Sequence, residues 1–481
     1  MKIFTNFLKN SVILAGLAVF GLGNFYFRTF MTNFDERDHL AAGFLMSKGW
    51  ILYKDIFSHH FPFPYYWVNF WNLLWVNQIP HRGIAMFRTT LNIYYLFCAV
   101  LVLSNLKKFS NRLLFVIFLI STVPLMPLFH GNILLSETFG FFPLIMIIWL
   151  LFSKLINELK NTPWLAISSA LLCSFAFWSQ PLLLPIFILP LFFVQPYKKI
   201  YIFSSAIAII IPILGFYING SLKYFWEMAI NFNWIIYPRY YADISPVTHF
   251  STNPVLLSQI IGALFLFFIS FYLLITKKFK YLFLLLFSLG LTLIRFTKII
   301  PGSLFNFGIL PFMMLINLSF ITIIYRANKY LKLPIIILFG VYLFLIFRAV
   351  KPIFYQSLDS NYNYHVFWSD RQEIGREINR LTNTNEPILI YPHDVDLYYF
   401  AQRTPPDKFL YWFPWINDVS QYRLAREQSI VHKFAGVIYT GDMQFKDQPN
   451  FYKAMWPNLT SGYTQATTEG KFSGIWKKTS L

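Results

Sequence analysis

The residues best suited to chemistry lie in a short acidic stretch near the N-terminus. The segment Asn33-Phe-Asp-Glu-Arg-Asp-His places Asp35, Asp38 and His39 at positions i, i+3 and i+4, which share one face of a helix. A carboxylate here, Asp35 or Asp38, could accept a proton from a nucleophile or bind a metal ion. The alternative is a helix N-cap followed by favourable first-turn acids, and the pattern leaves both open.

A second polar stretch begins at Asp55. His59 and His60 follow it and precede two prolines, in Tyr53-Lys-Asp-Ile-Phe-Ser-His-His-Phe-Pro-Phe-Pro-Tyr-Tyr-Trp. Because proline fixes its own backbone angle, we expect a stiff turn leading into an aromatic helix over 65–77. The histidines could hydrogen-bond a phosphate or bind a metal. A pair of interfacial histidines without a chemical role is an equal alternative.

The elements that position these residues are apolar. The chain is 56% hydrophobic and 13% charged, with mean hydropathy +0.50, whereas soluble domains contain about 25% charged residues. Eleven segments are candidates for membrane spans, which need about 20 apolar residues: 11–28, 83–106, 113–129, 137–157, 164–180, 181–196, 200–218, 254–276, 281–296, 304–325 and 334–349. The sequence therefore predicts a mostly α, polytopic membrane protein with about 11 transmembrane helices.

The basic residues predict the orientation of these spans. Clusters of Lys and Arg follow alternate spans, so with eleven spans and a cytoplasmic N-terminus they all fall on the cytoplasmic side. Much of the net charge of +19 is explained in this way. A nucleic-acid partner would require the basic residues together on one soluble face, so we expect membrane lipids as partners and no nucleic acid.

The acids predict where the chemistry takes place. Residues 1–349 contain eight acids, and on this topology all but Glu158 lie on the outer side, as do all six histidines of that part. We therefore expect the chemistry at the outer face. The outer loops 29–82 and 219–253 are rich in aromatic residues, which indicates helices lying in the membrane interface.

The C-terminal part has a different composition. Thirteen of the chain's acids lie after residue 349. We predict a transmembrane domain over 1–349 and a soluble, extracytoplasmic α/β domain over 350–481, with a helix at 369–381, a strand from Pro387, a helix from Asp396 and a strand at 436–439. The pair Asp394-Val-Asp396 is interpreted as a loop or the start of a helix.

Together, the acidic pair, the Gly-Trp-x-Leu-Tyr-x-Asp stretch and His60-Phe-Pro-Phe-Pro-Tyr-Tyr resemble the first outer loop of the GT-C glycosyltransferases. The similarity is to family 39, which includes protein O-mannosyltransferases and the aminoarabinose transferase of lipid A. The resemblance covers about residues 30–75. It implies a multi-pass enzyme of a bacterial-type cell membrane that uses polyprenyl-phosphate sugars, with Asp35-Glu36 matching the essential acidic pair of the family.

The same resemblance implies a second functional acid in the second outer loop, where Glu137 is available. Glu137 opens the fourth predicted span, and an acid near lipid needs a partner or a function. The alternative is an acid that complements the helix dipole.

Three basic residues near the outer ends of spans are candidates for binding the donor phosphate: Arg88, Arg295 and Lys298. Snorkelling to the interface is the alternative, and it is easier for Arg295 and Lys298 than for Arg88.

The expected function is transfer of a sugar from a polyprenyl-phosphate donor to a lipid, glycan or protein acceptor. Asp35 is the expected general base and Glu137 and Glu36 support it, with a divalent metal ion as an open alternative. Asp38, His39, Asp55, His59 and His60 are expected to bind substrate. A transporter or flippase, or a polymerase or ligase of lipid-linked glycans, remains the rival. A transporter would need polar residues at mid-membrane, where these spans are apolar.

Overall fold

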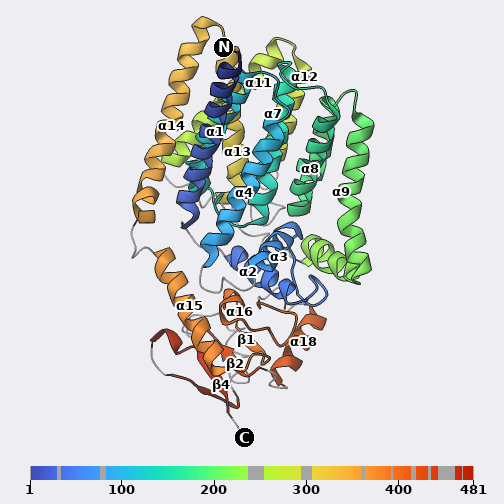
Figure 1. Ribbon diagram of the computed structural model, residues 1–481, viewed down its shortest axis with the longest axis vertical. Helices are drawn as coiled ribbons and strands as arrows, with labels where there is room; N and C mark the ends of the chain where they lie inside the picture. The colour runs from blue at the N-terminus through green and yellow to red at the C-terminus, as the bar shows by residue number, and fades with distance from the viewer. Residues whose placement is uncertain are drawn as a thin grey trace. The chain divides into compact units, whose positions relative to one another are not determined.

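The chain is mostly helical in the computed structural model (Figure 1). The described residues are 2–29, 34–75, 83–236, 254–293, 306–358, 363–391, 394–412, 416, 419–431, 435–441, 461–467 and 470–479. They form two compact units. The first comprises Met1–Met31, Arg88–Leu214 and Ala242–Asp359, and the second comprises Thr32–Phe87, Gly215–Tyr241 and Ser360–Leu481.

The first unit is built from apolar helices. They are α1 (Lys2–Tyr26), η1 (Phe27–Thr29), α4 (Gly83–Leu103), α5 (Phe109–Thr122), α6 (Leu125–Leu128), α7 (Ser136–Leu155), α8 (Pro163–Ser179), η2 (Pro181–Phe192), α9 (Lys198–Ile218), α11 (Pro254–Ile275), α12 (Phe279–Thr292), η7 (Asn306–Ile309), α13 (Leu310–Arg326) and α14 (Lys329–Leu358). Helices α4 and α9 begin or end in the second unit.

Helix α7 is the buried helix of this unit. Of its most apolar stretch, 83% is buried, and it packs beside α8 (Figure 1). An α-helix that is hydrophobic all round needs neighbours on all sides. The chain breaks after α8 at Gln180-Pro181, as the sequence predicts, because the prolines of η2 remove backbone donors that an α-helix requires.

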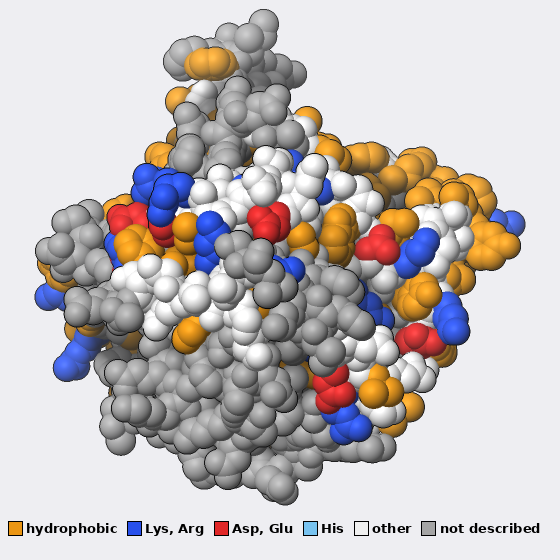
Figure 2. Space-filling model, turned by 90° about the horizontal axis from the view of Figure 1, so that it is seen from below, with side chains coloured by type: hydrophobic (Ala, Val, Ile, Leu, Met, Phe, Trp, Pro, Cys, Tyr) orange, Lys and Arg blue, Asp and Glu red, His pale blue; other side chains and the backbone are white. Residues whose placement is uncertain are grey.

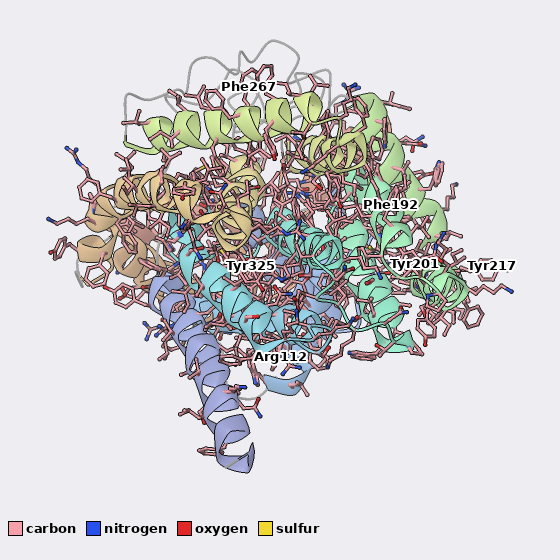
Figure 3. The ribbon with its side chains drawn as sticks, turned by 90° about the horizontal axis from the view of Figure 1, so that it is seen from above. Arg112, Phe192, Tyr201, Tyr217, Phe267 and Tyr325 are labelled. Carbon is pink, nitrogen blue, oxygen red and sulfur yellow. The ribbon has the colours of Figure 1, made fainter. Side chains whose placement is uncertain are left out.

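Other helices of this unit expose their apolar side chains. Only 17% of the most apolar stretch of α9 is buried, and 22% of those of α11 and α14. Figure 3 shows Phe267 of α11 and Tyr217 of α9 pointing outward, and their exposed fractions are 61% and 71%. Exposed apolar surface on this scale favours contact with lipid over contact with water.

Six of the described helices are long and apolar enough to cross a membrane. They cover Phe7–Thr29, Ile84–Leu103, Ser136–Leu155, Lys198–Ile218, Leu257–Ile275 and Lys329–Tyr355. The five remaining predicted spans coincide with shorter apolar helices: Phe109–Thr122, Pro163–Ser179, Pro181–Phe192, Phe279–Thr292 and Leu310–Arg326. The chain is therefore a mostly α protein with the helices of an integral membrane protein.

The second unit combines segments that are far apart in the sequence. Its helices are α2 (Phe34–Ser47), α3 (Phe63–Trp75), α10 (Leu222–Phe225), the π-helix η3 (Trp226–Ile236), α15 (Asn363–Leu381), α16 (Asp396–Ala401), α18 (Ser420–Val431) and η9 (Gly470–Phe472). The first predicted outer loop and part of the second thus pack with the C-terminal residues, and this division crosses the predicted boundary near residue 350. Residues 237–253 of the second loop lie outside the described residues.

A small mixed sheet lies at the C-terminal end of this unit. Its strands are β1 (Ile388–Ile390), β2 (Val437–Tyr439), β3 (Tyr463–Gln465) and β4 (Ile475–Lys478), in the order β1-β2-β4-β3. β1 and β2 are parallel, and both other pairings are antiparallel. The predicted helix at 369–381 falls within α15, and the predicted strands at 387 and 436 correspond to β1 and β2.

The surface of this unit carries mixed charge. On the described part of the face drawn in Figure 2, Lys and Arg side chains lie next to Asp and Glu side chains. Lys471 illustrates the pattern, with its Nζ 3.0 Å from Oδ1 of Asp370.

A glycine permits close packing of α2 on α3. A Cβ added at Gly43 would lie 2.5 Å from Cγ1 of Val68 and 3.1 Å from the backbone nitrogen of Asn69. These distances are far inside ordinary contact, so the two helices can approach this closely only because residue 43 lacks a side chain. The close approach brings the acidic face of α2 to the tyrosines of α3.

Candidate active site

Helix α2 carries the acidic stretch. Asp35 and Glu36 occupy its first turn, where carboxylates are favoured by the helix dipole. The side chain of Asp35 remains 33% exposed, whereas Glu36, Asp38 and His39 are buried. The helical spacing predicted from the sequence is present, and Asp35 is the accessible carboxylate of the three.

The segment after α2 forms a rigid turn. The amide of Ile51 donates to Oδ2 of Asp55 at 2.9 Å, and the backbone of Tyr53 takes the left-handed conformation with φ 69°. The Tyr53 hydroxyl then donates to the carbonyl of His60 at 2.9 Å. The side chain of Asp55 therefore stabilises the turn by accepting from the Ile51 amide, and this structural role requires no substrate.

The turn brings His60 to Asp35. The Nε2 atom of His60 lies 3.8 Å from Oδ1 of Asp35, and the imidazole is 20% exposed. The ring of His60 also lies 5.5 Å from the ring of His39, centroid to centroid. A partly exposed carboxylate beside a partly exposed imidazole is an arrangement that can accept and hold a proton.

Asp38 lies in the interior. Its Oδ2 accepts a hydrogen bond of 2.5 Å from the Tyr65 hydroxyl, which also pairs with the Ser58 hydroxyl at 2.6 Å. Burial raises the pKa of Asp38 to about 8, while the Tyr65 hydrogen bond opposes the shift and the Asp35 charge adds to it. Asp38 therefore keeps its proton near neutral pH, which makes it a poor general base.

His59 is held by two other segments of the same unit. Its Nδ1 hydrogen-bonds the hydroxyl of Tyr411 at 3.0 Å, and its carbonyl accepts a hydrogen bond from the side-chain amide of Asn233. Burial lowers the pKa of His59 well below its usual range, and the neighbouring His60 and His39 add to this. His59 is thus a neutral, internal histidine that ties the turn to η3 and to the C-terminal residues.

A cluster of four charged side chains in this unit was not predicted from the sequence. Arg37 Nη1 lies 3.1 Å from Oδ1 of Asp394 and 3.5 Å from Oδ1 of Asp396. Arg371 Nη2 lies 2.8 Å from the same Asp394 oxygen. Burial raises the pKa of Asp396, although both guanidinium groups oppose the shift. The Asp394-Val-Asp396 pair, interpreted from sequence as a loop or helix start, is thus also an ion-pair partner for α2.

Glu137 belongs to the first unit. It is buried in the first turn of α7, where its Oε1 accepts a hydrogen bond of 2.9 Å from Nε2 of Gln180. Gln180 is the C-cap residue of α8, and no sequence pattern indicated that it would be the partner of Glu137. The acid predicted to need a partner near lipid therefore has one.

Arg88 is also buried in the first unit. Its Nη1 donates to the carbonyl of Arg28 at 2.9 Å, and Asn132 donates to the carbonyl of Phe27 at 2.8 Å. Both acceptors lie in η1, the short 3-10 helix that directly follows α1, where carbonyls lack intrahelical partners. Burial, together with nearby Arg88, lowers the pKa of His130 to about 4. Arg88 is therefore an internal residue that binds a backbone carbonyl of η1 and does not snorkel.

The other basic candidates, Arg295 and Lys298, lie outside the described residues. Within the part of the chain that is described, no group of three or more His, Cys, Asp or Glu side chains could hold a metal ion. The predicted site residues thus fall into two groups. Among the described residues, one group lies in the second unit with Asp35, whereas Glu137 and Arg88 lie in the first unit, each with its own partner.

No protein-family model matches this chain, and no curated protein matches it. The function of the site is therefore inferred from the chemistry of its side chains. Around Asp35 the structure offers an accessible carboxylate and a nearby imidazole, supported by a buried network of hydroxyl groups. Such a set suits removal of a proton from a hydroxyl nucleophile.

Proposed function

We propose that this protein is an integral-membrane glycosyltransferase of GT-C type. It transfers a sugar from a polyprenyl-phosphate donor to a hydroxyl of a lipid, glycan or protein acceptor at the outer membrane face. The observation that carries the proposal is the Asp35–His60 pair, an accessible carboxylate with an imidazole nitrogen 3.8 Å away. It lies in the polar unit of a chain whose other unit is built from apolar, membrane-type helices.

The proposed reaction is a direct displacement at the anomeric carbon. Asp35 takes the proton of the acceptor hydroxyl while the oxygen of that hydroxyl forms a bond to the anomeric carbon of the sugar. The bond from that carbon to the phosphate oxygen breaks, and the configuration of the carbon inverts. The polyprenyl phosphate leaves as an anion, with the electron pair of the broken bond.

The leaving phosphate requires positive charge. In the proposal Arg295 and Lys298 supply it, because guanidinium and ammonium groups stabilise an anion strongly where water is scarce. Glu137 and Glu36 support the site. The alternative is that these carboxylates bind a divalent metal ion. The proposed reaction requires only that the acceptor carries a hydroxyl group.

The proposed topology places eleven spans in the membrane, with the N-terminus in the cytoplasm. The six helices long enough to cross are supplemented by the five shorter apolar helices, and the C-terminal residues lie outside. A reporter fused after Leu481 tests this order of spans. An active periplasmic reporter is expected, and a cytoplasmic signal would contradict the placement of the Asp35 group.

The activity test uses purified full-length protein, a set of polyprenyl-phosphate sugars and candidate acceptors. Wild type is expected to release polyprenyl phosphate, and Asp35→Asn to lose about 100-fold or more in rate because an amide cannot accept the proton. Glu227→Gln is the matched control, since Glu227 is an exposed carboxylate of the same unit. Full transfer by Asp35→Asn would disprove the base assignment. Translocation of a lipid-linked sugar without cleavage would favour a flippase.

A further inference from the structure

A chain of hydrogen bonds joins the two segments that carry Asp35 and His60. The amide N–H of His60 donates to Oγ of Ser58 at 3.1 Å. The Ser58 and Tyr65 hydroxyls pair at 2.6 Å, and the Tyr65 hydroxyl donates to Asp38 at 2.5 Å. When the Tyr65 hydroxyl donates to Asp38, the Ser58 hydroxyl donates to the Tyr65 oxygen, since Tyr65 has a single proton.

We propose that Ser58, Tyr65 and Asp38 are positioning residues that hold the His60 imidazole against the Asp35 carboxylate. The inference rests on the proposed function, because Asp35 and His60 are the groups that contact substrate there. The three positioning residues act through that pair and do not themselves contact the reacting atoms.

The burial of the two sets supports this division of roles. Ser58, Tyr65 and Asp38 have 0%, 0% and 1% of their surface exposed, so substrate cannot reach them without unfolding the turn. Asp35 and His60 keep 33% and 20% of their side chains exposed. The buried chain therefore supports an accessible pair, which is the arrangement needed to fix the geometry of a reactive group.

The two ends of this series of hydrogen bonds are close in sequence to Asp35 and His60. Asp38 follows Asp35 by one helical turn on α2, and Ser58 precedes His60 by two residues. Movement of the turn relative to α2 must therefore stretch or break the Tyr65 contacts. Each of these hydrogen bonds is buried, and a buried polar group left without its partner is costly.

A second contact holds the backbone carbonyl of His60. The hydroxyl of Tyr53 donates to the His60 carbonyl at 2.9 Å, while the His60 amide is held by Ser58. Both polar groups of the His60 backbone are thus fixed by buried side chains. The ring of His39 packs edge-on against Tyr65 with centroids 4.6 Å apart, which restricts the tyrosine in turn.

Asp38 is suited to be the fixed end of this chain. Within the described part of the protein, its Oδ1 has no hydrogen-bond partner, and a buried carboxylate with one donor would be poorly stabilised as an anion. Burial accordingly raises the pKa of Asp38 to about 8. A neutral Asp38 accepts from Tyr65 and leaves the negative charge on Asp35, one turn away.

The first test is kinetic. Tyr65→Phe removes only the hydroxyl, and we expect kcat to fall about tenfold with the donor KM unchanged, since a misplaced group weakens the reaction more than binding. Tyr66→Phe is the matched control, because it removes the hydroxyl of the next, partly exposed tyrosine. Ser58→Ala repeats the test at the neighbouring link.

A double-mutant cycle separates positioning from general stability. In the His60→Ala background, Tyr65→Phe is expected to cause no further loss of kcat, because the group that it positions is gone. Equal fold losses in both backgrounds would overturn the inference. So would an unchanged kcat in Tyr65→Phe itself.

A measurement that does not depend on sugar transfer tests the positioning role separately from the proposed function. Diethyl pyrocarbonate modifies accessible imidazoles, and peptide mass spectrometry gives the rate at His60. We expect Tyr65→Phe to raise that rate about threefold, as a released side chain gains exposure, and Tyr66→Phe to leave it unchanged. A raised rate in a protein that transfers no sugar would support the positioning chain and reject the transferase. An unchanged rate would reject the positioning chain.

Discussion

The guanidinium Nη1 of Arg37 lies 3.1 Å from Oδ1 of Asp394, although 357 residues separate the two in the sequence. Arg37 stands between Glu36 and Asp38 on α2, so this ion pair ties the acidic helix to the C-terminal residues of the same unit. The C-terminal part is therefore a structural component of the candidate active site and does not stand apart from it.

Loss of this ion pair is expected to destabilise the second unit. Arg37→Ala leaves Asp394 and the buried Asp396 with Arg371 as their remaining guanidinium partner, and removing one member of a buried ion pair costs about 3–5 kcal/mol. The measurement is thermal unfolding of purified protein. Arg376→Ala, which alters an exposed arginine of α15, is the control. Equal melting temperatures for Arg37→Ala and wild type would show that the cluster contributes nothing.

The raised pKa of Asp38 predicts a loss of stability as the pH rises. Its pKa is about 8 in the folded protein against an ordinary value of 3.8, so the folded state binds the proton more tightly than the unfolded state. This stabilisation is complete below about pH 4 and disappears as the pH rises to about 8. The slope is at most about 1.4 kcal/mol per pH unit for one group.

Asp38→Asn isolates this contribution. The variant cannot titrate at this position, so its melting temperature should fall less than that of wild type between pH 5 and pH 8. The groups that act on Asp38 are the Tyr65 hydroxyl and the Asp35 carboxylate, and Asp35→Asn provides the second comparison. Parallel pH curves for wild type and Asp38→Asn would contradict the raised pKa.

Glu137 allows a test that separates its charge from its hydrogen bond. Glu137→Gln keeps an oxygen that can accept from Gln180, so the stability should change by about 1 kcal/mol or less. If its charge serves the proposed reaction, transfer should nevertheless fall about 100-fold. Gln180→Ala provides the reverse case, with lower stability and a smaller effect on transfer. Normal transfer by a stable Glu137→Gln would assign Glu137 to structure alone.

The approach of α2 to α3 depends on Gly43. Gly43→Ala places a methyl group against Val68, and such overpacking typically costs about 1–3 kcal/mol. Val68→Ala in the same chain should recover part of the loss, because it opens the space that the new methyl needs. The melting temperatures of the single and double variants measure this recovery. Additive losses would indicate that the two side chains do not meet.

Periodicity and composition determined the local structure from sequence. Runs of apolar residues can satisfy their backbone polar groups only by forming helices in a lipid environment, so each predicted span corresponds to an apolar helix. The spacing of Asp35, Asp38 and His39 predicted one helical face, and α2 has it. Pro181 marked the end of α8 because proline cannot donate the required hydrogen bond.

Only the tertiary structure decided the role of each polar residue. Asp35 and Asp38 are equivalent by sequence pattern, yet α3 covers one and leaves the other accessible, and burial then separates their chemistry. Asp394 and Asp396 acquired partners because the fold brings α2 to the C-terminal residues. Ion pairs, hydrogen bonds and burial depend on distances between remote segments, which local periodicity does not encode.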